Sequence, residues 1–427
     1  MRKKKLIRPR FKPQKAAEME KDMNFNEAMK KLEQFGQKHV LDYYGELTDE
    51  QKKELLEQID RTDFTVIEQA DEAGKRGVIA PIKAMTIPEI DMGRERFERI
   101  GMEAVRAGKV GAVLLAGGMG TRLGSDAPKG MYDIGINRSV YIFQRVIENL
   151  MKVVERAGNY IQLFIMTSEK NHNATVNFFK EHAYFGYAPE YIAFFMQDMA
   201  PAADFDGKVY MEAKSSIATS PNGNGGWFLS MKKSGLLELV ERRGIEWLNV
   251  FAVDNVLQSI ADPVFIGAVL EGGYSVGSKV IRKVSPQEKV GVMCTEDGRP
   301  SIVEYIELTQ EMLTQKDESG EYAYNFGVIL NYLFKVDKLI GLLERKLPYH
   351  KSAKKIPYIN EKGEAVKPEE PNGYKYEQFI LDMIQMLDSC LPFEVVRGKE
   401  FAPIKNRTGV DSVESARELL KKNGIEI

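Results

Sequence analysis

The stretch VLLAGGMGTRLGSDAPKGMYDIG spans Val113–Gly135 and starts as an apolar strand that runs into a series of glycines. Glycines at positions 117, 118, 120 and 124 let the backbone approach a ligand and turn its amides toward phosphate oxygens. Arg122 and Lys129 add positive charge to the same loop. The spacing matches neither Walker A nor the Rossmann GxGxxG fingerprint. A glycine-rich turn alone could be structural, but a strand followed by Arg and Lys favours a triphosphate-binding loop.

Around this loop, short apolar runs alternate with amphipathic stretches. VGAVLLAGG (110–118), YIQLFIMTS (160–168) and WLNVFAVDNVL (247–257) are typical of buried strands, and amphipathic segments lie between them. This alternation predicts βαβ units and a mostly parallel sheet. GSKVIRKV (277–284), EKVGVM (288–293) and SIVEYIEL (301–308) alternate more strictly, which predicts half-exposed strands in an antiparallel portion. We therefore expect an α/β fold with a mixed, mostly parallel sheet.

The composition narrows the class of protein. The chain has 427 residues, 43% of them hydrophobic, and its 60 Lys+Arg against 62 Asp+Glu give a net charge of −2. Near-neutral charge argues against a nucleic-acid binder, and no run reaches the roughly 18 apolar residues of a membrane span. Cys294 and Cys390 are far apart and lack neighbouring His or Cys, so we expect no disulfide and no zinc site. A cytoplasmic location fits best.

The N-terminal part differs from the rest of the chain. Residues 1–15 are basic and are expected to form a solvated arm, whereas residues 24–74 are polar and helical in pattern. Thr48 and Gln51 have the spacing of a capping box, and Leu55, Leu56 and Ile59 form an apolar stripe. We expect this stripe to pack against the next domain rather than to act as a lid. The predicted division is 1–105 for arm and helical cap, 106–398 for the catalytic core and 399–427 for a short C-terminal segment.

Several motifs together carry a family resemblance. The GGxGTRLG…PKGM pattern resembles the uridylyltransferases that make UDP-sugars, and within them the UDP-N-acetylhexosamine pyrophosphorylases. The similarity recurs in FFMQDMAP, SPNGNGGWF, VDNVLQSIADPVFIG, EYIEL, KPEEPNGYKYEQFILD and FAPIKN, and covers roughly residues 23–406. It implies a Rossmann-like nucleotidyltransferase core of the GT-A-like type. It also implies the reaction of UTP with an N-acetylhexosamine 1-phosphate, most simply N-acetylglucosamine 1-phosphate, to give a UDP-sugar and pyrophosphate.

The resemblance also implies which residues bind the nucleotide. The contacts to UTP would come from Leu115, Ala116, Gly117, Gly118 and Lys129. Gln197 would meet the uracil edge, where an amide can both donate and accept, and Gly223 would lie against the base. Lys375 would contact UTP phosphate. On chemical grounds Arg122 can hold the triphosphate, while Lys129 can neutralise charge that develops on the α- or β-phosphate during transfer.

Asp254 is the candidate metal ligand. It follows a buried strand, where ligands bind in open α/β sheets, and a hard carboxylate suits Mg²⁺ or Mn²⁺ on phosphate oxygens. The alternative is that Asp254 is an N-cap for the following helix. Asn255 is a weaker candidate, for orienting either the sugar or Asp254.

The sugar phosphate is assigned by resemblance to Asn224, Glu304, Tyr305, Asn325 and Lys405. This is where the chain departs most from the family. NFGV replaces the usual NAGN, so Phe326 adds bulk and Val328 removes an amide; EYIE replaces EYSE, and Met119 replaces Gln in the glycine loop. Base and phosphate recognition should survive these changes. The choice of sugar stays open, with glucose, galactose or N-acetylgalactosamine 1-phosphate as alternatives.

A different class of function is a non-catalytic protein that binds nucleotide sugars. Against it stands the joint presence of Arg122, Lys129, Asp254, Lys375 and Lys405. The sequence predicts UTP and a sugar 1-phosphate as partners, with no membrane and no nucleic acid, and does not indicate an oligomeric state.

Overall fold

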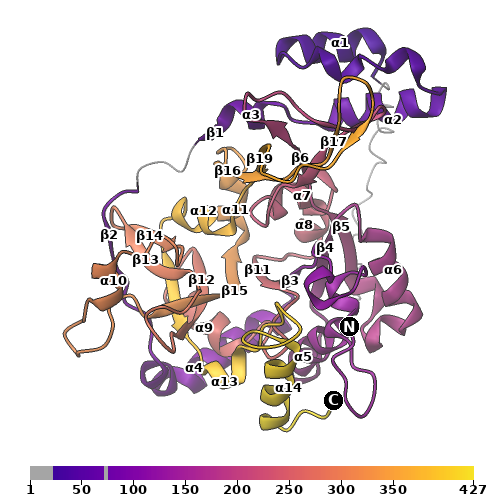
Figure 1. The fold of residues 1–427 in the computed structure, drawn as a ribbon. Helices are drawn as coiled ribbons and strands as arrows, with labels where there is room; N and C mark the ends of the chain where they lie inside the picture. Colours follow the sequence, from indigo (N-terminus) through magenta and orange to yellow (C-terminus); the bar gives the residue numbers. More distant parts are fainter. Residues whose placement is uncertain (1–22, 72–75) are drawn as a thin grey trace, which may run out of the picture.

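The centre of the molecule is a ten-stranded mixed sheet (Figure 1). The computed structural model describes residues 23–71 and 76–427, so the predicted basic arm at residues 1–15 lies outside the described residues. One half of the sheet is parallel and contains, in order, β5 (Ile192–Met196), β4 (Gln162–Thr167), β3 (Val110–Leu115) and β11 (Trp247–Ala252). Its strands are the apolar runs that the sequence identified. The fully buried β3 and β4 are what helices on both faces of a parallel sheet require.

The other half of the sheet is largely antiparallel. The long strand β15 (Phe326–Lys335) runs antiparallel to β11 on one side and to β12 (Val276–Arg282) on the other. The remaining strands are β20 (Cys390–Glu394), parallel to β12, and β13 (Val292–Glu296), β14 (Arg299–Val303) and β2 (Ile79–Pro81). The predicted α/β fold with a mixed sheet is confirmed.

The prediction of half-exposed strands in this half is wrong. Residues Val276–Ile281 of β12 are buried, and β13 and β14 are mostly buried as well. The polar residues in GSKVIRKV suggested an exposed face, but Lys279 is 0% exposed and pairs with the carboxylates of Asp262 and Glu400. Polarity alternation therefore did not report exposure here.

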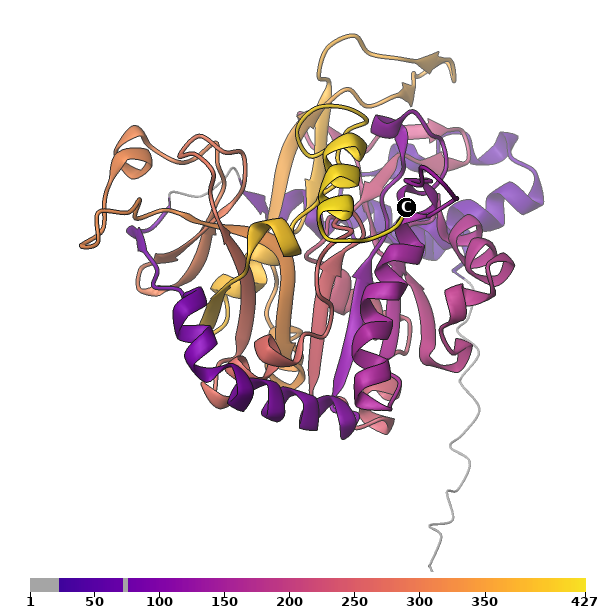
Figure 2. The ribbon, with the colours of Figure 1, turned by 90° about the horizontal axis from the view of Figure 1, so that it is seen from below.

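Two layers of helices cover the sheet. One face packs against α4 (Ile87–Arg106), α5 (Ile142–Ala157), α6 (His172–Glu181), α9 (Pro263–Glu271) and α14 (Val413–Lys422). Figure 2 shows the long purple α4 and the yellow α14 on this side of the strands. The opposite face packs against α7 (Trp227–Lys233), α8 (Leu237–Arg242), α11 (Val336–Leu342) and α12 (Ile380–Gln385). Alternate residues of β3 enter the two cores, Leu114 on one face and Val113 on the other.

The helical cap contains α1 (Phe25–Gln34), α2 (Asp49–Arg61) and α3 (Thr65–Gln69). The capping box of α2 is confirmed: Thr48 Oγ1 accepts from the Gln51 amide, and Gln51 Oε1 accepts from the Thr48 amide. Leu55 and Ile59 are buried and Leu56 is partly buried in a cluster that includes Ala203 and Tyr376 of the next unit. The predicted packing of the cap is therefore confirmed.

The cap packs on a second, smaller sheet with the order β1 (Ala70–Asp71), β16 (Tyr349–Lys354), β19 (Gly373–Glu377) and β7 (Ala203–Asp204). Short elements complete the fold: β6 (Met199–Pro201), β8 (Met211–Ala213), β9 (Ser216–Ile217), β10 (Thr219–Pro221), β17 (Tyr358–Ile359), β18 (Ala365–Val366), α10 (Gln310–Thr314) and α13 (Arg397–Glu400). The division at residues 105 and 398 stays a prediction. Within it, α4 packs against α9 and the large sheet rather than against the cap helices.

The described part of the chain contains no helix that is long and apolar enough to cross a membrane. Cys294 and Cys390 are both buried free thiols, as expected from their separation in the sequence. Burial raises the pKa of the Cys294 thiol to about 12, so it stays protonated and unreactive at neutral pH.

Candidate active site

The parallel strands deliver their carboxyl ends to one edge of the sheet. Three backbone bonds align the segments that leave it: the Ala116 amide donates to Met166, the Gln197 amide to Thr167, and the Val253 amide to Leu115. Loops that follow different strands are thereby held side by side. Ligands bind at such edges of open α/β sheets, and the candidate residues of three loops meet here.

The glycine-rich loop is fixed from within. It contains two short 3₁₀ turns, Thr121–Leu123 and Lys129–Met131. The Gly120 amide donates to the Ala127 carbonyl (2.8 Å), and the Lys129 amide donates to the Gly118 carbonyl (3.1 Å). The second bond returns the chain to the start of the loop, which brings Lys129 beside the glycines. Arg122 lies at the exposed outer turn.

The side chain of Asn171 also holds this loop in place, a role that was not predicted from the sequence. Its buried Nδ2 donates to the carbonyls of Ala116 (2.9 Å) and Gly118 (3.3 Å), while its Oδ1 accepts from the Ser168 amide (2.7 Å). One side chain thus binds the glycine loop to the loop after β4. The signal was present in the motif SEKNHN, but an asparagine at a helix start is ordinarily read as a cap.

Gln197 lies directly against the glycine loop. A Cβ atom placed on Gly117 would come within 2.5 Å of Gln197 Nε2, so only glycine leaves this amide in place. Gln197 is buried, with 7% of its surface exposed. Gly223 has φ of +85°, and a Cβ there would lie 2.4 Å from the Gln378 carbonyl oxygen. Position 223 therefore requires glycine, because its φ is positive and the clash would be with backbone atoms, whereas a side chain at position 117 would displace the Gln197 amide.

Lys129 and Asp254 form an ion pair across the edge of the sheet, with Nζ 3.4 Å from Oδ2. Asp254 follows β11 and is partly exposed. The N-cap alternative for Asp254 is wrong, because α9 is capped by Asp262, whose Oδ1 accepts from the Val264 amide. The Asp254 carboxylate is therefore not used for capping and lies beside a cation next to the glycine loop.

A cavity of about 380 Å³ adjoins this ion pair. Its walls include six candidate residues: Asn224, Asp254, Asn255, Glu304, Tyr305 and Lys405. Burial and the nearby Glu307 carboxylate raise the pKa of Glu304. Apolar lining comes from Ile302, Val328 and Leu330, which the nucleotide motifs did not predict. The cavity is thus lined by both charged and apolar side chains.

Lys405 comes from a segment that is bonded to Asp254. The Ile404 amide donates to the Asp254 carbonyl (3.0 Å), and Asn255 and Pro403 form an antiparallel bridge. The Lys405 ammonium pairs with Asp411 at 2.9 Å. Asn255 is hydrogen-bonded to the same segment: its Nδ2 donates to the Glu400 carbonyl (2.7 Å), and its Oδ1 accepts from the Ala402 amide (2.9 Å).

Two further candidates, Lys375 and Asn325, do not line the cavity. Lys375 is on β19, and its pKa is lowered by burial and by the nearby charge of Lys170, which directly precedes Asn171. Asn325 is buried at the start of β15, where its carbonyl accepts from the Lys283 amide, and it does not line the cavity. Of the two departures in NFGV, Val328 lines the cavity, whereas Phe326 lies under the Arg282 guanidinium, 5.3 Å from ring centroid to Cζ.

The donor set is compatible with a magnesium ion held jointly with substrate. No group of three or more His, Cys, Asp or Glu side chains that could hold a metal occurs in residues 23–71 and 76–427. Mg²⁺ commonly binds through one or two carboxylates together with substrate phosphates and water, so the single carboxylate of Asp254 fits that mode.

The parallel half of the sheet brings a rigidly held glycine loop, lysines and one carboxylate to the same edge. These groups meet the requirements of phosphoryl chemistry on a nucleotide. The fold is that of a nucleotidyltransferase. More specifically, the chain belongs to the UTP–glucose-1-phosphate uridylyltransferase family, whose model matches residues 76–425. Members of this family are uridylyltransferases, and the resemblance seen in the sequence is confirmed.

Individual relatives agree with this assignment. The chain is 36% identical over 406 residues to UDP-N-acetylhexosamine pyrophosphorylase-like protein 1 of Mus musculus, covering 89% of this chain and 80% of the relative. It is 40% identical over 342 residues to the UDP-N-acetylglucosamine pyrophosphorylase of Saccharomyces cerevisiae, covering 77% and 71%. The crystal structure of the uridine diphosphate N-acetylglucosamine pyrophosphorylase from Trypanosoma brucei superposes with a TM-score of 0.78 at 27% identity, covering 92% of this chain and 84% of that one.

Proposed function

We propose that this uridylyltransferase joins UTP to an N-acetylhexosamine 1-phosphate, with N-acetylglucosamine 1-phosphate as the first candidate, and releases pyrophosphate. The observation that carries the proposal is that the Lys129–Asp254 ion pair lies between the glycine loop and the cavity. On one side lies the glycine loop, and on the other lies the cavity lined by Glu304 and Lys405. The names of the mouse and yeast relatives support the choice of sugar.

The reaction is a direct in-line displacement. A phosphate oxygen of the sugar 1-phosphate attacks the α-phosphorus of UTP, and a new P–O bond forms. The bond from the α-phosphorus to the bridging oxygen breaks, and pyrophosphate leaves with the electron pair. We assign the incoming phosphate to Lys405, which lines the cavity, and the charge on the α- and β-phosphates to Lys129, which pairs with Asp254. No covalent enzyme intermediate is required.

Recognition of the base is assigned to the amide of Gln197. Its position against Gly117 puts a paired donor and acceptor next to the phosphate loop, as a uracil edge requires. Gly223 would lie on the other side of the base. Arg122 and Lys375 would contribute positive charge to the triphosphate from the outer turn and from β19.

Asp254 would hold Mg²⁺, or Mn²⁺ in its place. When bound, the ion would neutralise charge on the phosphate oxygens of the substrate. Asp254 is also the partner of Lys129, so the carboxylate can keep the lysine near the phosphates. The charges of the site are thus arranged around the transferring group.

A hexose 1-phosphate is the second candidate substrate, and Val328 is the observation that favours it. This side chain lines the cavity at the position where the family pattern has an asparagine. Position 328 therefore supplies no amide to bind a sugar substituent. Glucose, galactose and N-acetylgalactosamine 1-phosphates belong in the same test.

The test is pyrophosphate release from UTP with a panel of sugar 1-phosphates in the presence of Mg²⁺. The proposal expects the highest kcat/KM for N-acetylglucosamine 1-phosphate. Higher kcat/KM for glucose or galactose 1-phosphate would instead establish the second candidate. UTP binding without turnover on any sugar would establish a non-catalytic binding protein.

We also propose a cytoplasmic location, which the two buried free thiols support. Fractionation of cells that express the chain, with detection of the protein in the cytosolic fraction, tests this location.

A further inference from the structure

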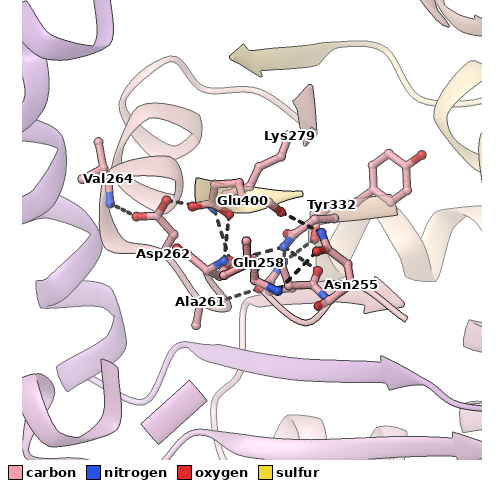
Figure 3. A network of polar contacts seen from close by, with 12 residues as sticks. Asn255, Gln258, Ala261, Asp262, Val264, Lys279, Tyr332 and Glu400 are labelled. Carbon is pink, nitrogen blue, oxygen red and sulfur yellow. Dashed lines mark hydrogen bonds and ion pairs between the residues drawn. The ribbon is translucent and has the colours of Figure 1, made fainter. Parts of the chain in front are cut away.

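A network of ion pairs and hydrogen bonds surrounds the buried Lys279 (Figure 3). Lys279 of β12 is 0% exposed, and its Nζ lies 2.9 Å from Asp262 Oδ2 and 3.2 Å from Glu400 Oε2. The same ammonium donates to the Ser259 carbonyl at 3.2 Å. Lys279 thus uses its donors on three groups from two different segments of the chain.

These two segments are also bonded to each other. The Glu400 carboxylate accepts from the Ser259 amide (2.8 Å), and the Glu400 carbonyl accepts from Asn255 Nδ2 (2.7 Å). Asn255 Oδ1 in turn accepts from the Ala402 amide (2.9 Å). Residues 255–262, which lie between β11 and α9, are therefore hydrogen-bonded to residues 400–402, which comprise the last residue of α13 and the two residues after it.

The tied segments carry the two charged groups of the proposed transfer reaction. Asp254 immediately precedes the first segment, and Lys405 is the third residue after the second segment. The Ile404 amide donates to the Asp254 carbonyl at 3.0 Å, which extends the same set of bonds to the edge of the cavity. A shift between the segments would change the separation of Asp254 and Lys405.

Stability alone is a weak explanation for this cluster. Removing a lysine and two carboxylates from water is costly, and well-packed apolar residues often serve a core as well or better. The cluster also determines how the two segments are positioned, because each hydrogen bond is directional and fixes one segment relative to the other. Buried polar groups of this kind specify one arrangement among several that packing would allow.

We propose that Lys279 and Asn255 are positioning residues that hold Asp254 and Lys405 at the distance required for transfer. This proposal rests on the proposed function of those two residues. Lys279 does not line the cavity, and Asn255, which does, is 2% exposed and uses its amide group on Glu400 and Ala402. Their effect reaches the reaction through the backbone of residues 254–262 and 400–405.

The first experiment measures hydrogen–deuterium exchange in ligand-free protein. Lys279→Met keeps the side-chain length and removes the ammonium, and we expect faster exchange of the Ala402 and Ile404 amides. A peptide covering β4 should keep the wild-type rate. Lys283→Met is the matched control, because Lys283 is also buried but donates to the Pro286 carbonyl and to neither segment. Equal exchange in Lys279→Met and wild type at residues 400–405 overturns the proposal.

Lys279→Met leaves two carboxylates without their cation and can lower the yield of folded protein. Asn255→Leu therefore provides a second variant, since it removes two of the bonds without leaving a buried charge unpaired. The same local increase in exchange is expected in this variant. Faster exchange over the whole sheet in Asn255→Leu would show a general structural role and overturn the proposal.

Steady-state kinetics give the second readout. In either variant we expect kcat/KM for the sugar 1-phosphate to fall by roughly 10²-fold, as misplacement of reacting groups by about 1 Å can do, and the Mg²⁺ requirement to rise. The KM for UTP should stay within about twofold, because the glycine loop is held separately by Asn171. Equal rises in both KM values overturn the positioning role.

The two proposals fail differently. If the wild type turns over no sugar 1-phosphate, the proposed function fails, while the exchange measurement still reports whether Lys279 couples the segments. If the wild type is active and the variants match it in exchange and kinetics, only the positioning role fails.

Discussion

The nucleotide side of the active site and the sugar side are built by different means. On the nucleotide side, residues 116–131 follow a parallel strand and are held by backbone bonds and by Asn171. On the sugar side, β15 runs antiparallel, and its register against β12 shifts between Ser278 and Val280. Leu330, opposite this shift, has φ of +53° although it is not glycine, and it lines the cavity.

This difference indicates where the chain can change. On the nucleotide side, the backbone of the glycine loop is fixed by hydrogen bonds, which few substitutions can alter without losing the loop. The sugar is met by side chains on an irregular strand, where an exchange such as Asn for Val328 leaves the backbone in place. Strained positions of this kind cluster at functional sites. We infer that substrate choice diverges on the sugar side while UTP recognition is retained.

The strongest test of the nucleotide side is Lys129→Ala. We expect the rate of turnover to fall on the order of 10²-fold, because the ammonium neutralises charge that develops in the transition state. Binding of UTP, measured by calorimetry without sugar phosphate, should fall much less. Equal losses of turnover and binding would contradict a transition-state role for Lys129.

Asn171→Leu should weaken the support of the glycine loop without removing a charge. The variant leaves the Ala116 carbonyl and the Ser168 amide without their partner, at a cost of about 1–3 kcal/mol each. We expect the KM for UTP to rise roughly tenfold and the melting temperature to drop. The KM for the sugar 1-phosphate should hardly change. An unchanged KM for UTP would show that the loop keeps its shape without this support.

Val328→Asn tests the sugar side alone. Restoring an amide to the cavity wall should change the ratio of kcat/KM between N-acetylglucosamine and glucose 1-phosphates by about fivefold, the scale of one net hydrogen bond. Phe326→Ala is the matched control, because Phe326 packs under Arg282 and should leave the ratio unchanged. A larger change from Phe326 than from Val328 would reverse our placement of specificity.

The smallest expected effect concerns Glu304. Burial and Glu307 raise the pKa of Glu304 above 4.5, so the fold favours its protonated form. The corresponding stability is present below pH 4.5 and is lost as pH rises through the raised value. Glu304→Gln stays neutral and should therefore melt at the same temperature as wild type at pH 4 but slightly higher at pH 7. A difference that is constant with pH would argue against this titration.

The sequence predicted much of the fold because local chemistry agrees with tertiary structure there. Apolar runs became the parallel strands, and Thr48 with Gln51 formed the expected capping box. The placement of Lys129, Asp254 and Lys405 near one another also agrees with the motifs. In each case, the information is carried by residues a few positions apart.

What could not be predicted depends on partners distant in sequence. From the sequence alone, Lys279 is expected at the surface, because its partners Asp262 and Glu400 are distant in the chain. The prediction that β12 is half-exposed was wrong for this reason. From the sequence alone, Asn171 is expected to cap a helix, whereas in the structure its amide donates to the carbonyls of residues 116 and 118. The register shift of β15 and the orientation of Val328 have no local signature, since they arise from pairing with β12.

The bridge between Asn255 and Pro403 also has a consequence for how the enzyme is made. The parallel strands and the glycine loop leave the ribosome early, whereas Lys405 is synthesised 151 residues after Asp254 (405 − 254 = 151). At translation rates of about 5–20 residues per second, this separation corresponds to roughly 8–30 s. During that interval a nascent chain can form the nucleotide loop but cannot yet place the lysine for the sugar phosphate. Capacity for transfer is therefore acquired late in synthesis, after the strands that bind nucleotide have emerged.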